Sequence, residues 1–167
     1  MNEDTILENK IKHTSARKFI LNYFEKNKEL QDKLYLKKCF FSENLQLIGS
    51  DIFAISEEDF SLKACFDIEV QSHKWIDDSD YPSEFINCSN KKEYMWNEDL
   101  FKKSLPKKFD INNKIINYYI ILNKNLTKGI FISGEYINKY MIIPKFTNKR
   151  KANYVKIPLE KFIKVNF

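Results

Sequence analysis

Apolar residues recur every three or four positions near the start of the chain, which is the spacing of one face of an amphipathic helix. The pattern predicts a helix over residues 15–34, with Thr14 or Ser15 capping its first turn. A shorter helix is expected over residues 3–12. The apolar positions of the longer helix are Ala16, Phe19, Ile20, Tyr23, Phe24, Leu30 and Leu34.

Beyond the helix the pattern changes to short runs rich in β-branched and aromatic residues, which are typical of strands. The acidic segment 56–59 lies between two of these runs and predicts the turn of a hairpin. Residues 72–95 are expected to form an irregular connection, residues 97–104 a helix, and residues 160–165 a last helical turn or strand. The runs expected to form strands are 35–41, 45–48, 51–55, 62–70, 115–122, 129–133, 140–143 and 154–157.

This order of elements predicts one domain over residues 1–167, of the α/β (α+β) class, with a central mixed β-sheet flanked by helices. The chain is 43% hydrophobic and includes 14 Phe and 9 Tyr, which is enough apolar material for a packed core. It has no run near the roughly 18 apolar residues of a membrane span, and its acidic start lacks the apolar run of a secretory signal. The three cysteines are widely spaced, which favours a reducing compartment. We therefore expect a soluble, cytoplasmic protein without a membrane partner.

Charge is distributed unevenly along the chain. Residues 1–100 carry 13 Lys or Arg and 20 Asp or Glu, whereas residues 101–167 carry 15 Lys or Arg and 3 Asp or Glu. A basic segment joined to an acidic remainder suggests a polyanionic partner, of which nucleic acid is the usual example. An AT-rich coding sequence would also raise the number of lysines, but it would not remove the acids. The sequence has no phosphate loop, G-x-G-x-x-G or G-x-S-x-G motif, which argues against a nucleotide-binding enzyme and a serine-hydrolase elbow.

The best strand candidate, residues 62–70, continues into a polar segment whose side chains alternate between two faces. Phe66, Ile68 and Val70 fall on one face, which is expected to enter the core. The other face carries carboxylates, an amide and an imidazole, a combination that needs water, partners or a cation. Its residues are Cys65, Asp67, Glu69, Gln71 and His73. A solvated strand face without any chemistry is an equally weighted interpretation.

Asp51 opens the strand before this one, directly after Gly49 and Ser50. If the two strands pair as a hairpin, the start of the first lies near the end of the second, and Asp51 approaches Glu69. Two converging carboxylates repel each other unless a proton or a metal ion lies between them. Oxygen ligands of this kind suit Mg²⁺ or Mn²⁺, with water completing the coordination shell.

An Asp at the start of one strand, an acidic hairpin turn, and then Ile68-Glu69-Val70-Gln71 on the next strand resemble the PD-(D/E)xK nuclease superfamily. The resemblance covers residues 15–75 and extends to the expected strand at 115–122. It implies a restriction-endonuclease-like fold, in which the N-terminal helix precedes the hairpin that carries the site.

The resemblance also implies the roles of individual residues. Asp51, Glu69 and the Val70 carbonyl would hold a divalent ion, which would lower the pKa of a bound water and stabilise the transition state. Several branches of the family carry a further Glu on the N-terminal helix, and Glu25 is the candidate for it. Glu8 and Glu29 are the alternatives to Glu25.

The sequence departs from the family pattern at Gln71, where Lys is usual, although some members have Gln there. Within the resemblance, Gln71 orients the attacking water or the phosphate, but it cannot supply positive charge. A substitute cation would have to come from Lys74, Lys91 or Lys92. Without such a cation, the domain would bind nucleic acid and cleave it poorly or not at all.

Four cations and an aromatic residue lie within residues 145–151. Such a segment can contact phosphates, and its binding would weaken with salt. A solvated surface loop is the alternative and the more common fate of a charge run, but the scarcity of acids nearby favours the phosphate contact. The expected nucleic-acid contacts in this segment are Lys145, Lys149, Arg150 and Lys151.

Together these patterns predict a Mg²⁺- or Mn²⁺-dependent phosphodiesterase, an endonuclease or exonuclease, that acts on DNA. DNA rather than RNA is implied by the resemblance alone, and so is a homodimer. The alternative function is a non-catalytic domain of the same fold that binds nucleic acid or a protein, which the Gln at position 71 favours. A structural or assembly protein without a nucleic-acid partner is the third hypothesis.

Overall fold

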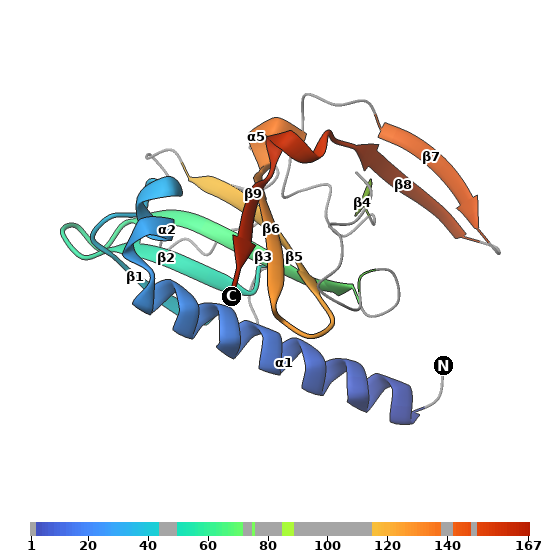
Figure 1. Ribbon diagram of the computed structural model, residues 1–167, viewed down its shortest axis with the longest axis horizontal. Helices are drawn as coiled ribbons and strands as arrows, with labels where there is room; N and C mark the ends of the chain where they lie inside the picture. Colours follow the sequence, from blue (N-terminus) through green and yellow to red (C-terminus); the bar gives the residue numbers. More distant parts are fainter. Residues whose placement is uncertain are drawn as a thin grey trace.

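The structure, a computed structural model, describes residues 3–43, 50–71, 75, 85–88, 115–137, 142–147 and 150–167; of these, 3–13, 71, 85–88, 135, 137, 142–147, 150–156 and 159 are described by their backbone alone. The helices are α1 (Glu3–Lys26), α2 (Lys28–Lys33) and α5 (Gly134–Ile137), with a 3₁₀ helix η1 (Leu159–Lys161). None of the described helices is long and apolar enough to cross a membrane. The strands, shown in Figure 1, are β1 (Cys39–Glu43), β2 (Ile52–Ser56), β3 (Leu62–Gln71), β4 (Phe85–Cys88), β5 (Ile116–Asn123), β6 (Lys128–Ser133), β7 (Ile142–Thr147), β8 (Arg150–Lys156) and β9 (Ile163–Asn166).

The N-terminal helix α1 runs without a break from Glu3 to Lys26. It therefore joins the helix expected over residues 3–12 to the first part of the helix expected over residues 15–34. The interruption falls at Asn27, whose side chain accepts a hydrogen bond from the Leu30 N–H at 2.9 Å and so begins α2. A short amide side chain that bonds to nearby backbone competes with continuation of a helix. Asn27 therefore caps a second helix where the apolar repeat alone predicts an unbroken one.

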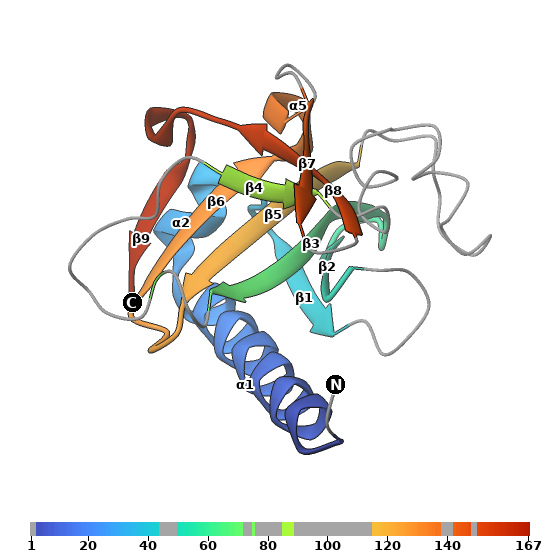
Figure 2. The same ribbon diagram turned by 90° about the vertical axis from the view of Figure 1, so that its right-hand side faces the viewer.

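Six strands form a mixed sheet in the order β1-β2-β3-β5-β6-β9. β3 and β5 run parallel, from Ala64 opposite Ile116 to Gln71 opposite Asn123, and the other neighbours in this sheet are antiparallel. A smaller sheet has the order β4-β8-β7. Figures 1 and 2 show it on the side of the six-stranded sheet away from α1. The expected mixed α+β class with a central mixed sheet is therefore confirmed.

Several strand boundaries differ from those expected from the sequence. The run at 35–41 begins with a turn, because Tyr35 and Lys38 have positive φ values of 58° and 54°, and β1 starts only after them. Part of the expected irregular connection, Phe85–Cys88, is a strand. The expected strand at 45–48 and the expected helix at 97–104 lie outside the described residues.

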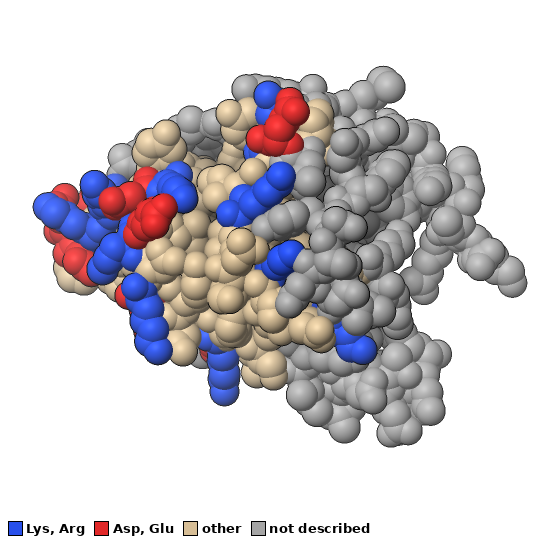
Figure 3. Space-filling model, in the orientation of Figure 1, with Lys and Arg blue, Asp and Glu red and all other residues tan. Residues whose placement is uncertain are grey.

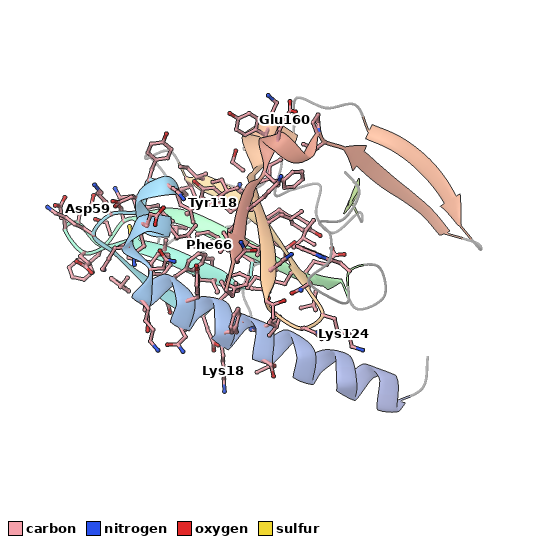
Figure 4. The ribbon with its side chains drawn as sticks, viewed as in Figure 1. Lys18, Asp59, Phe66, Tyr118, Lys124 and Glu160 are labelled. Atoms are coloured by element: carbon pink, nitrogen blue, oxygen red, sulfur yellow. The ribbon has the colours of Figure 1, made fainter. Side chains whose placement is uncertain are left out.

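The main core lies between α1 and one face of the six-stranded sheet. The ring of Phe24 on α1 stacks on Phe41 of β1 with centroids 4.8 Å apart, and it lies 4.8 Å from the ring of Phe66 of β3. Phe66 stacks in turn on Tyr118 of β5, with ring centroids 5.2 Å apart; both residues are labelled in Figure 4. Full burial of one such ring contributes about 1.5–3 kcal/mol. This aromatic column fixes the position of α1 against the sheet.

The opposite face of the sheet has a smaller apolar cluster, and Cys65 of β3 belongs to it. Burial raises the pKa of the Cys65 thiol, against the smaller effect of a hydrogen bond with Ser50, so the thiol stays protonated at neutral pH. The cluster consists of Phe53, Leu62, Cys65 and Ile115. This face of β3 is therefore apolar at its start, and its carboxylates come further along the strand.

The β2–β3 hairpin is closed by the acidic turn that the sequence predicts. Oδ1 of Asp59 accepts hydrogen bonds from the hydroxyl and the N–H of Ser61, at 2.6 Å and 3.1 Å. These bonds hold the pKa of the Asp59 carboxyl well below its usual range. The turn joins the strands in a register that places Ile52 opposite Phe66. Asp51, which precedes Ile52, consequently lies alongside β3.

Phe167 follows β9 and packs against α1. Its ring makes edge-to-face contacts with Phe19 and Tyr23, with centroids 5.0 Å and 4.7 Å apart. Its N–H donates to the Thr127 carbonyl at 2.8 Å. A Cβ atom on Gly129 of β6 would lie 2.9 Å from Cε2 and Cζ of this ring. Glycine is therefore needed at position 129 so that Phe167 can approach the strand closely.

We predict that Gly129→Ala displaces the Phe167 ring and lowers the free energy of unfolding by about 1–3 kcal/mol, as other overpacked sites do. The change is measured by urea denaturation. In a Phe167→Ala background the same substitution is expected to cost less, because the ring is gone and Cδ2 of Leu122, 3.0 Å from the new Cβ atom, is the remaining close neighbour. Equal losses in both backgrounds would contradict the steric explanation.

Candidate active site

Asp51 is held against the backbone of β3. Its N–H donates to the Phe66 carbonyl at 2.7 Å, and the Ile68 N–H donates to its Oδ2 at 2.8 Å. The carboxylate thus takes the place of the backbone carbonyl that a longer β2 would offer. The Asp51 side chain is 21% exposed, and Nε of Arg17 on α1 lies 3.8 Å from its Oδ1. The hairpin brings Asp51 to Ile68, the residue before Glu69; the expected convergence of the Asp51 and Glu69 carboxylates stays a prediction.

The carbonyl of Val70 faces the same edge of β3 as Asp51. In an antiparallel pair, alternate residues turn their N–H and C=O groups toward the same neighbouring strand. Phe66 and Ile68 turn these groups toward β2 and Asp51, so Val70, two residues further on, does the same. A backbone oxygen and a carboxylate therefore lie along one edge of the strand.

Glu69 leaves β3 on the face opposite to α1. Its neighbours Ile68 and Val70 belong to the core beneath α1, and successive strand side chains point to opposite faces. On the far face the hydroxyl of Tyr119 of β5 donates a hydrogen bond to Oε2 of Glu69. Tyr119 is buried. The two carboxylates therefore have their contacts on different sides. Asp51 lies near Arg17 of α1, and Glu69 is bonded to Tyr119 of β5.

Two buried polar residues accompany Glu69 on β3 and β5. Asp67 precedes it on the same face and is only 6% exposed. Asn123 is fully buried, and its Oδ1 accepts hydrogen bonds from the N–H groups of Thr127 and Lys128 at 2.9 Å and 3.0 Å. Asn123 thus stabilises the turn between β5 and β6, whereas Asp67 adds a second carboxylate to the face of Glu69.

α1 places the guanidinium of Arg17 beside Asp51, and the carboxylate of Glu25, which was expected there, lies elsewhere on the helix. Arg17 is the α1 residue that lies at Asp51. Glu25 follows eight residues later, which is about 12 Å further along the helix axis, and its side chain is exposed. Of the alternatives, Glu29 is an exposed residue of α2, and Glu8 lies in the part of α1 described by its backbone alone.

The basic residues expected to contact phosphates are only partly described. The segment 145–151, expected to lie between two short strands, mostly belongs to the paired strands β7 and β8, in which Thr147 is paired with Arg150. Lys145 lies in β7, and Arg150 and Lys151 lie in β8. Gln71 is the last residue of β3 and is described by its backbone alone. Outside the described residues are Lys74, Lys91, Lys92 and Lys149.

Acidic and basic side chains are intermixed at the end of the molecule formed by α2 and the β2–β3 turn, as Figure 3 shows. Lys38 pairs with Glu58 at 2.6 Å, and Lys37 pairs with Asp32 at 3.4 Å. Because these lysines are paired with neighbouring carboxylates, they offer little attraction to a polyanion. A DNA-binding surface is expected elsewhere.

In the part of the chain that the structure describes, no group of three or more His, Cys, Asp or Glu side chains is arranged to hold a metal ion. The ligand set expected from the resemblance is smaller, with two carboxylates and one carbonyl. All three are the oxygen donors that Mg²⁺ and Mn²⁺ prefer, and water commonly fills the rest of such a shell. The donor chemistry at Asp51, Glu69 and Val70 therefore fits these ions.

Arg17 and Tyr119 are contacts that the sequence pattern did not identify. Arg17 adjoins the buried Ala16, so the helical repeat already placed it at the border of the core. The contact between Tyr119 and Glu69 has no signal in the local sequence, because it depends on the parallel register in which Tyr119 lies opposite Asp67.

Comparison of the chain with models of protein families, with curated proteins and with solved structures finds no match. The resemblance of the Asp51 and Glu69 pattern to a nuclease family therefore stays a prediction.

We predict that Tyr119→Phe lowers the free energy of unfolding by about 1–2 kcal/mol, because it removes a hydrogen bond to a charged group that is only partly shielded from water. A double-mutant cycle with Glu69→Ala, measured by urea denaturation, is expected to give a coupling of about 1 kcal/mol. Tyr118→Phe is the matched control, since its hydroxyl donates to the Leu34 carbonyl on the α1 side. Equal coupling of Glu69 to both tyrosines would contradict the assigned contact.

Proposed function

We propose that this chain is a metal-dependent phosphodiesterase of the PD-(D/E)xK type, a DNA endonuclease or exonuclease with a restriction-endonuclease-like fold. The observation that carries the proposal is the Asp51 carboxylate, which is docked on the backbone of β3 beside Glu69. The order of α1, the strands β1 to β3 and the parallel strand β5 covers the same residues as the resemblance, which supports the proposed fold.

The proposal assigns the divalent ion, Mg²⁺ or Mn²⁺, to Asp51, Glu69 and the Val70 carbonyl. The Ile68 N–H donates to Oδ2 of Asp51, so the ion would bind at Oδ1, the oxygen beside Arg17. Glu69 must extend past the edge of β3 to share this ion, and the Tyr119 hydroxyl limits how far its carboxylate can turn. When bound, such an ion activates water and stabilises negative charge on a phosphate.

The other residues supply positioning and charge. Gln71 ends β3 next to the proposed ligands, and its amide would orient the attacking water or the phosphate. The cations of β7 and β8, Lys145, Arg150 and Lys151, would hold the DNA backbone through salt-sensitive contacts. Lys74, Lys91, Lys92 and Lys149 have the same proposed role. A homodimer rests on the resemblance alone.

A non-catalytic nucleic-acid-binding domain is the second candidate. Arg17 beside Asp51 favours it, because a guanidinium can neutralise this carboxylate without a metal ion. The uncharged Gln71 favours it as well.

Incubation of supercoiled plasmid DNA with the protein and Mg²⁺ or Mn²⁺ tests the proposal. We predict metal-dependent nicking that falls by about 100-fold or more in Asp51→Asn and in Glu69→Gln, because each loses the charge that a cation requires. Asp51→Asn keeps an oxygen that can accept the Ile68 N–H, so loss of activity through misfolding is minimised.

Asp32→Asn and Glu57→Gln are matched controls, since they make the same chemical changes at exposed positions of α2 and of the β2–β3 turn and are expected to retain full activity. Salt-sensitive retardation of DNA without nicking by the wild-type protein would instead support the non-catalytic domain. The absence of retardation even at low salt would leave the structural or assembly protein.

A further inference from the structure

Arg17 and the proposed ion would share one oxygen of Asp51. Oδ2 accepts the Ile68 N–H at 2.8 Å, and Nε of Arg17 lies 3.8 Å from Oδ1. The side chains of Arg17 and Asp51 are 23% and 21% exposed, so part of each side chain reaches solvent, whereas Nε of Arg17 is buried. A divalent cation bound at Oδ1 would therefore lie close to a guanidinium group.

Repulsion between this guanidinium and a bound cation would oppose binding of the cation alone. A phosphodiester group can relieve it, because a phosphate anion placed between the two cations is attracted to both. Guanidinium groups bind phosphate oxygens through paired hydrogen bonds. The same charge would compensate for Gln71, which cannot supply a positive charge to the phosphate.

We infer that Arg17 couples the two ligands of the site: it weakens binding of a divalent cation alone and strengthens binding of the cation together with a DNA phosphate. The inference rests on the proposed function and adds to it a residue that contacts the substrate phosphate. It assigns this role to the N-terminal helix, not to the lysines that follow β3.

Titration of the full chain with Mn²⁺, followed by calorimetry in the presence and absence of a short DNA duplex, measures the coupling. A duplex with uncharged methylphosphonate linkages is the ligand control, and the integrity of the DNA is checked after each titration. For the wild-type protein, the normal duplex is expected to tighten Mn²⁺ binding by a factor within roughly 5–150-fold. The methylphosphonate duplex is expected to leave Mn²⁺ affinity unchanged.

Arg17→Gln is expected to bind Mn²⁺ alone more tightly than the wild-type protein and to reduce the coupling to within about twofold of none. Arg17→Lys keeps the charge and is expected to keep part of the coupling, which guards against a loss caused by unfolding. Lys18→Gln is the matched control: it removes one charge from the next residue of α1, which projects away from the sheet in Figure 4, and should retain the wild-type coupling.

The two levels of the proposal fail in different ways. Wild-type coupling that persists in Arg17→Gln, or Mn²⁺ binding with no coupling in the wild-type protein, would overturn the role of Arg17 and leave the metal site standing. Absence of Mn²⁺ binding by the wild-type protein, with or without DNA, would remove the metal site and the role of Arg17 together.

Discussion

The hydrogen bond from the Ile68 N–H to the Asp51 carboxylate is the contact on which the candidate site depends. It forms because β2 and β3 pair in one register from Ala54 opposite Ala64 to Ile52 opposite Phe66, after a shift of one residue between Ala54 and Ile55. A further shift by one residue in this part of the hairpin would turn the side chains of residues 52–54 to the other face of the sheet and would take Ile52 out of the core beneath α1. The position of one carboxylate is therefore set by the packing of a whole strand.

The aromatic column from Phe24 through Phe66 to Tyr118 connects this local contact to the rest of the fold. It holds α1 across the sheet, and α1 in turn places Arg17 at Asp51. The alternation of β3 sends Glu69 to the other face, where β5 supplies Tyr119. α1 thus contacts the Asp51 carboxylate, and β5 contacts the Glu69 carboxylate. In the proposal, one divalent ion would bind both carboxylates.

Much of this arrangement follows from short-range pattern. The apolar repeat of α1, the acidic hairpin turn and the alternation of β3 are all local properties. The place of Asp51 just before β2 and the direction of Glu69 away from the core follow from them, whereas the convergence of the two carboxylates stays a prediction. The contacts of Arg17 and Tyr119 could not, because they depend on how α1 crosses the sheet and on the parallel register of β3 with β5. Asn27 shows the opposite case, in which a single local hydrogen bond overrides a correct apolar period. Glu25 lies on the expected helix but too far along it to meet Asp51, since the sequence alone gives no helix position relative to the sheet.

The central claim is that Asp51 and Glu69 hold one cation at the edge of β3. A crystal structure determined with Mn²⁺, using the anomalous scattering of the metal, tests it most directly. We predict a single anomalous peak at about 2.1 Å from Oδ1 of Asp51 and from oxygens of Glu69 and Val70, the distance usual for such ions. No peak at this edge, with Asp51 still paired to Arg17 and Glu69 still bonded to Tyr119, would contradict it.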